Sequence, residues 1–237
     1  MAAVAHGHGH DEALHHQFED IDQQNESYIV GMWSFLVTEI MFFGALFFTY
    51  TLYRWTYQLD WWKAHNTLNV ALGGVNTFNL LLSSFFMVMA VYWAQMHNRK
   101  KVLLWLAAVQ ACAFVFLVIK FFEYSAKFEH HLFPGINFTT DASHLQNANL
   151  NHAQLFFGLY FGMTGLHGVH VIVGILLIGA LMWMWFKNNP LVTKDFVPTE
   201  MIGLYWHFVD LVWIFLFPLF YLMPSPAPVI TRLLGGH

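Results

Sequence analysis

Charged residues are scarce in this sequence. Only 10% of the 237 residues are Asp, Glu, Lys or Arg, whereas a soluble domain has roughly 25%. Hydrophobic residues make up 57% of the chain and aromatic residues 19%. This composition excludes an ordinary soluble domain and predicts an integral membrane protein.

Basic residues and cysteine are also few. The ten Lys and Arg residues are scattered and the formal net charge is -4, so the chain lacks the basic footprint of a nucleic-acid-binding protein. The single cysteine, Cys112, lies in an apolar stretch and excludes an internal disulfide. We interpret it as a small buried hydrophobic residue.

Five apolar runs are long enough to cross a bilayer. About 20 residues of helix span the hydrocarbon, where every backbone polar group must be satisfied within the element. We therefore predict an all-α integral membrane protein: a polar, His-rich tail at 1–28, a domain of five transmembrane helices at 29–223 and a C-terminal tail at 224–237. The predicted spans are 30–53, 67–94, 102–124, 155–185 and 201–223.

Five spans place the two termini on opposite sides of the membrane. The side that carries the N-terminus also carries the compact basic turn at 99–101 and two further lysines, Lys187 and Lys194. Short loops rich in Lys and Arg stay in the cytoplasm. We predict a cytoplasmic N-terminus and a periplasmic C-terminus.

Glu39 is the only charged residue between Gly31 and Tyr50 in the first span. A carboxyl group inside a membrane is expensive to keep, and its own span offers it no basic partner. It must be protonated, bonded to a neighbouring helix or close to water. Both a structural hydrogen bond and proton handling are open interpretations.

The last two spans carry histidines at a spacing of three. His167 and His170 share one side of the fourth helix, and His207 shares a side of the fifth helix with Asp210. Three histidines and nearby carboxyls could form a metal or haem site. However, the spans lack the Glu-x-x-His arrangement of di-iron bundles, and buried histidines often bond to other helices. We favour interhelical hydrogen bonds and keep the metal site as the alternative.

Other residues suggest how the helices pack. Gly158 and Gly162 form a GxxxG pattern, which predicts close approach of another helix. Asn76 and Asn79 share one face of the second span, and we expect them to form interhelical hydrogen bonds. We expect Lys120, near the end of the third span, to extend toward the interface. The role of Glu123, in the same turn, stays open.

Several motifs together resemble subunit III of haem-copper oxidases, best known from cytochrome c oxidase. The resemblance covers all five spans in order, and the last two motifs are long and specific. It matches the five-helix bacterial form, which lacks the two-helix arm of the seven-helix mitochondrial form. The motifs are Thr38-Glu-Ile-Met-Phe-Phe43, Asn76-Thr77, Glu123-Tyr124, Thr164-Gly-Leu-His-Gly-Val-His-Val-Ile-Val-Gly174 and Tyr205-Trp-His-Phe-Val-Asp-Leu-Val-Trp-Ile-Phe-Leu216.

The resemblance implies an accessory subunit of a prokaryotic inner membrane, without catalytic residues or a metal of its own. Haem and copper would belong to subunits I and II, and this chain would pack against subunit I, bind structural phospholipid and support proton uptake. Membership of a larger respiratory supercomplex is a further possibility.

The resemblance also assigns roles to individual residues. Glu39 matches the family's buried carboxyl, with His207 expected beside it. It places His167, His170, Asp210 and Glu123 as interhelical hydrogen-bonding partners.

Two alternatives stay open. A quinol oxidase or a nitric oxide reductase could use a subunit of the same fold. An independent membrane metalloenzyme would instead use His167, His170 and His207 as metal ligands.

Overall fold

A computed structural model describes residues 17–129, 131–135, 138 and 149–224. Throughout these ranges the regular elements are helices, and five of them are long and apolar enough to cross a membrane. The predicted all-α fold with five membrane helices is confirmed. The helices are α1 (Ile21–Thr56), α2 (Gln58–His65), α3 (Val70–Gln95), α4 (Arg99–Glu129), α5 (Leu150–Phe186), α6 (Pro190–Thr193) and α7 (Val197–Tyr221).

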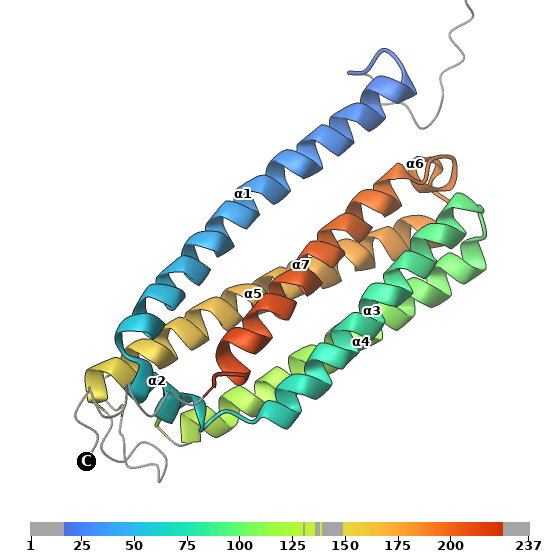
Figure 1. Ribbon diagram of the computed structural model, residues 1–237. Helices are drawn as coiled ribbons and strands as arrows, with labels where there is room; N and C mark the ends of the chain where they lie inside the picture. Colours follow the sequence, from blue (N-terminus) through green and yellow to red (C-terminus); the bar gives the residue numbers. More distant parts are fainter. Residues whose placement is uncertain (1–16, 130, 136–137, 139–148, 225–237) are drawn as a thin grey trace, which may run out of the picture.

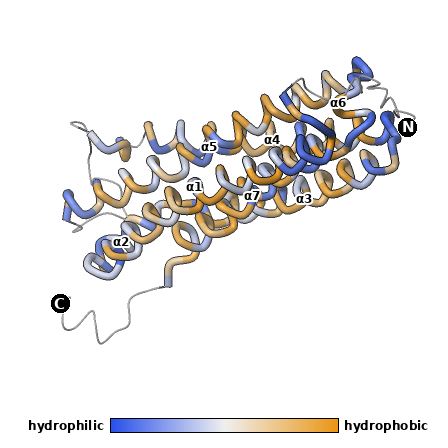
Figure 2. Tube along the Cα trace, turned by 90° about the horizontal axis from the view of Figure 1, so that it is seen from above, coloured by the Kyte–Doolittle hydropathy of each residue, from blue (hydrophilic) through white to orange (hydrophobic). Residues whose placement is uncertain are grey.

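The helices form an elongated bundle in which α7 packs between its neighbours (Figure 1). Helices α3 and α4 form a closely packed hairpin, α7 lies against α3 and α5, and α4 also contacts α5. Hydrophobic residues dominate the middle of the long helices, and hydrophilic residues gather at the two ends of the bundle (Figure 2). This distribution is the one expected of a bundle that crosses a membrane.

Helix α1 attaches to the bundle along a narrow stripe. Its buried positions Leu36, Phe43 and Tyr50 recur every seven residues, which places them on one side of the helix. Toward its N-terminus α1 diverges from α7 (Figure 1). Most of the surface of α1 therefore faces outward.

The start of α1 differs from the prediction. The helix begins at Ile21, inside the segment that we expected to be a polar tail. The Asp20 side chain accepts a hydrogen bond from the Gln23 backbone amide at 2.7 Å. Asp-x-x-Gln is a helix-start signal that hydropathy alone overlooks. The rest of the predicted tails, at 1–16 and 225–237, lies outside the described residues.

Two helices end in the same left-handed turn. His97 after α3 and Asn188 after α5 have φ angles of 51° and 53°. The next residue in each turn, Asn98 or Asn189, donates its amide to a carbonyl five residues earlier, at 3.0 Å in both cases. These bonds satisfy carbonyls that a helix end leaves unpaired. Asn189 then caps α6 by accepting a bond from the Leu191 amide.

Side chains of α1 and α2 cap the C-terminal end of α7. The Tyr50 hydroxyl donates to the Leu219 carbonyl at 2.5 Å, and His65 Nδ1 lies 2.8 Å from the Phe220 carbonyl. Because a carbonyl oxygen can only accept, His65 carries its proton on Nδ1. The short helix α2, which the hydropathy pattern did not predict, is held in place partly by this bond.

The close helix contacts occur at other glycines than predicted. A Cβ atom built at Gly158 or Gly162 has no neighbour within 4 Å in the described chain, so no helix within the described residues approaches the GxxxG pattern closely. A Cβ at Gly174 would lie 2.7 Å from the Trp206 ring. The GxxxG pattern of α5 therefore faces away from the other helices of this chain. Gly174, on the same helix, leaves the space in which the Trp206 ring packs.

Replacing Gly174 with alanine should destabilise the bundle. The added methyl group would displace the buried Trp206 ring, and overpacking of this kind costs about 1–3 kcal/mol of unfolding free energy. Gly158→Ala on the same helix is the matched control and should gain about 0.5–1 kcal/mol through helix propensity. Unfolding of the two variants in mild detergent, followed by circular dichroism, compares them. Equal stability would contradict the contact.

Candidate functional site

Glu39 meets a histidine across the interface between α1 and α5. His170 Nε2 lies 3.1 Å from Glu39 Oε2, and the two side chains are 17% and 19% exposed. The other ring nitrogen, Nδ1, lies 2.8 Å from the Leu166 carbonyl and must donate to it. A neutral His170 ring then has only a lone pair at Nε2, so one proton lies between Glu39 and His170.

The residue beside Glu39 is therefore His170, and the expectation that His207 would lie there is wrong. His207 points toward α3, where its Nδ1 lies 2.7 Å from Ser84 Oγ. Sequence spacing fixes which residues share a face of α7. It does not say which neighbouring helix that face meets, and here the face meets α3 and not α1.

Three other polar residues lie in the centre of the bundle. Asn76 on α3, His167 on α5 and Asp210 on α7 are 0%, 0% and 3% exposed. Within the described part of the chain, no side-chain nitrogen or oxygen of these three residues has a hydrogen-bond partner of standard geometry. The predicted interhelical bonds are therefore not found for them.

Aromatic rings surround His167. Its ring centroid lies 5.4 Å from that of Phe116 on α4 and 5.2 Å from that of Trp213 on α7. Although His167 and His170 are only three residues apart, one is enclosed by rings and the other reaches a carboxyl group at the edge of the bundle. The two histidines therefore differ in chemistry.

The expected bond from Asn79 is present, and tryptophans supply further bonds. Asn79 Nδ2 donates to the Cys112 carbonyl of α4 at 2.8 Å. Trp206 donates to Ser83 and Trp213 to Thr77, both at 3.0 Å. The sequence analysis did not predict these indole donors, and both rings are buried.

Lys120 does not extend to the interface but forms a buried ion pair. Its Nζ lies 2.8 Å from Glu123 Oε2 and donates to the Tyr221 hydroxyl at 2.7 Å. Glu123 Oε1 accepts further bonds from the hydroxyls of Tyr160 and Tyr221. Helix α4 continues to Glu129, so Lys120 lies inside the helix and not at its end. Glu123 therefore links α4 to α5 and α7.

The structure keeps the three histidines apart. His167 faces Phe116 and Trp213, His170 faces Glu39, and His207 faces Ser84. Among the described residues, no three His, Cys, Asp or Glu side chains gather in an arrangement that could hold a metal ion. This geometry does not favour the alternative of a histidine-ligated metalloenzyme.

Replacing one residue of the buried ion pair should cost far more unfolding free energy than replacing both residues. Lys120→Met or Glu123→Gln alone leaves one polar partner without its counterpart, and we expect a loss of about 3–5 kcal/mol in unfolding free energy for Lys120→Met. The double variant should recover much of this loss. Lys100→Met, at an exposed position of the same helix, is the control and should stay within about 0.5 kcal/mol. Additive effects of the two single changes in chemical unfolding would refute the coupling.

Comparison with known proteins gives a consistent result. The family described as Cytochrome c oxidase subunit III matches residues 15–225. The chain is 28% identical over 214 residues to the "Probable quinol oxidase subunit 3" of Staphylococcus saprophyticus, covering 89% of this chain and 97% of the relative. It is 32% identical over 195 residues to the "Cytochrome c oxidase subunit 3" of Synechocystis, covering 81% of this chain and 74% of the relative.

These similarities span all five membrane helices and the polar positions described above. The relatives are subunits of oxidases named for two different electron donors. The chain therefore belongs to the cytochrome c oxidase subunit III family.

Proposed function

We propose that this chain is the accessory, non-redox subunit III of a respiratory haem-copper terminal oxidase, which reduces oxygen to water and translocates protons. The family match over residues 15–225 carries the proposal. Membership of this family implies association with other oxidase subunits. We place the complex in a prokaryotic inner membrane, with subunits I and II as the direct partners.

The polar residues of the bundle support a structural contribution. Glu123, Lys120, Thr77 and Ser83 bond to neighbouring helices, so they hold the bundle together. A rigid bundle of this kind suits a subunit that stabilises subunit I. In this proposal haem and copper belong to subunits I and II, and no catalytic residue lies in this chain.

A groove beside α1 supports the binding of structural phospholipid. It has a volume of about 420 Å³ and lies between the N-terminal half of α1 and the segment from α5 to α7. Its lining is almost entirely apolar, with Met32, Met184 and Met201 among the contributing residues. An acyl chain fits this chemistry, because flexible methionines adapt to it. Ordered lipid here would tie α1 to the rest of the bundle.

The Glu39–His170 pair supports a contribution to proton uptake. The two residues share one proton and are partly exposed on the α1–α5 side of the bundle. A group that can shift a proton between two atoms at this position can influence the environment of a neighbouring proton path. Its effect on catalysis would be indirect.

A quinol oxidase is the second candidate, since the Staphylococcus relative carries that name. The donor binds elsewhere in such a complex, so the partner subunits distinguish the two. A copper-ligand motif in the neighbouring subunit II would indicate cytochrome c, and its loss would indicate quinol.

A spectrum of the purified complex tests the accessory role. We expect haem and copper in the complex by reduced-minus-oxidised spectroscopy and metal analysis, and neither in this chain after its partners are removed. Stoichiometric haem or metal on the isolated chain would overturn the proposal.

Glu39→Gln should leave the haem content unchanged and shorten the lifetime of the complex under turnover. Glutamine can still donate to His170 but can no longer exchange the shared proton. The weakened pair should cost about 0.5–1.5 kcal/mol in stability. Glu26→Gln, at an exposed position of the same helix, is the matched control. Activity followed over repeated turnovers measures the effect, and complete loss of haem in Glu39→Gln would contradict it.

A further inference from the structure

Three side chains of α1, each one turn from the next, contact the bundle at the level of Glu39. The Phe35 ring centroid lies 6.1 Å from that of Tyr205 on α7. Glu39 meets His170 on α5, and the Phe43 ring packs edge-on against the same imidazole, with 5.3 Å between the ring centroids. Residues four apart stack along one side of a helix. One side of α1 therefore contacts α7 through Phe35 and α5 through Glu39 and Phe43.

Tyr205 joins the two helices that carry the Glu39–His170 pair. Its hydroxyl donates a hydrogen bond to the backbone carbonyl of His170 at 3.1 Å, while its ring lies against Phe35 of α1. A carbonyl oxygen has two lone pairs, so it can accept this bond in addition to the one within α5. Tyr205 is buried. It is thus bonded to the turn of α5 that holds His170 and packed against α1 one turn from Glu39.

The position of the His170 ring follows the backbone of α5. Its Nδ1 donates to the Leu166 carbonyl at 2.8 Å, a bond within the same helix, so the imidazole has little freedom of its own. The distance from Nε2 to Glu39 then depends on how close this turn of α5 lies to α1. That distance is 3.1 Å, near the long end of the usual range, and an increase of about 0.5 Å would break the hydrogen bond.

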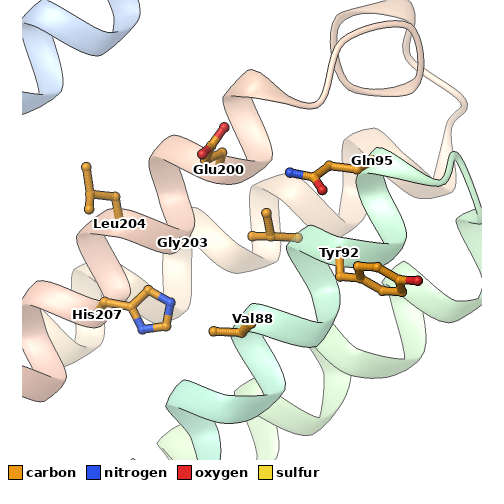
Figure 3. Close-up of a pocket in the computed structure, with 8 residues that line it drawn as sticks. Val88, Tyr92, Gln95, Glu200, Gly203, Leu204 and His207 are labelled. Atoms are coloured by element: carbon orange, nitrogen blue, oxygen red, sulfur yellow. The ribbon is translucent and has the colours of Figure 1, made fainter.

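His207 has a different environment, although it lies two residues from Tyr205 on α7. It points toward α3, where it lines a groove of about 370 Å³ between α3 and α7, with Val88 of α3 across from it (Figure 3). Its Nδ1 lies 2.7 Å from Ser84 Oγ. His207 therefore reports on the packing of α7 against α3, while His170 reports on the packing of α5 against α1.

We propose that Tyr205 is the positioning residue of the Glu39–His170 pair. Its hydroxyl holds the His170 turn of α5, and its ring contacts α1 through Phe35, so the two helices lie at the separation at which His170 Nε2 reaches the carboxyl group. Tyr205 acts through the backbone of His170 and not on the shared proton. Such positioning deepens the proposed contribution of this pair to proton uptake, and its effect on the oxidase rests on that proposal.

Nitrogen NMR of the full chain, with isotope-labelled histidine and in lipid nanodiscs, reads the bond at His170. The Nε2 signal of His170 is identified as the one lost in His170→Gln, and Glu39→Ala gives its position when the bond to the carboxyl group is absent. Tyr205→Phe keeps the ring and removes the hydroxyl. We expect the His170 signal in Tyr205→Phe to shift from its wild-type position toward its position in Glu39→Ala.

A second signal and a matched variant separate positioning from a general loosening of α7. The His207 signal should stay in place in Tyr205→Phe, because His207 faces α3. Thr77→Val removes the acceptor of the Trp213 indole, a bond between α7 and α3, and should leave the His170 signal unmoved. An unmoved His170 signal in Tyr205→Phe, an equal shift in Thr77→Val, or an equal displacement of the His207 signal would overturn the proposal.

Activity of the assembled complex distinguishes this positioning from the proposed role in proton uptake. Tyr205→Phe should shorten the lifetime under turnover, as Glu39→Gln does, and leave the haem content unchanged. A shifted His170 signal with an unchanged lifetime in both variants would support the positioning and contradict the role in proton uptake. An unmoved His170 signal contradicts the positioning alone.

Discussion

The structure depends on one constraint: inside a membrane, a polar group must find its partner on another part of the protein. Lipid tails offer no hydrogen bonds, so donors and acceptors between helices determine which helices meet and in what register. Helix α7 supplies several of these donors. Trp206 and Trp213 reach α3, and Tyr221 reaches Glu123 on α4. A shift of α7 by one turn would break all three bonds, so they fix its position along the bundle.

The end of α7 obeys the same constraint. The last carbonyls of a helix have no partner within it. The Tyr50 hydroxyl and the His65 ring donate hydrogen bonds to two of these carbonyls in α7. These side chains belong to α2 and to α1, and α1 has its buried positions along a narrow stripe. Satisfying backbone oxygens at one end of α7 therefore holds the outermost helix close there. Toward its N-terminus, α1 diverges from α7 (Figure 1).

The sequence predicts the features that depend on length and composition. It does not predict which helix each polar side chain contacts. Span length and apolar content were enough for five helices. The spacing of Glu39 from other charges was enough to predict that it needs a partner. The identity of that partner, His170, depends on which helices meet, and helical periodicity does not contain this information. Lys120 was misplaced for the same reason, because Tyr160 and Tyr221 come from distant parts of the chain.

His167 and His170 lie on the same helix but have different surroundings. Residues three apart on a helix differ by about 60° in direction. This difference directs His167 into the aromatic core and His170 to the edge of the bundle, where it contacts Glu39. His207 lies at an edge as well, in the groove between α3 and α7. Glu39, His170 and His207 therefore lie on the sides of the bundle, while buried bonds hold the helices in register. An influence of this chain on proton movement must act through those sides, where a partner subunit or water can reach them.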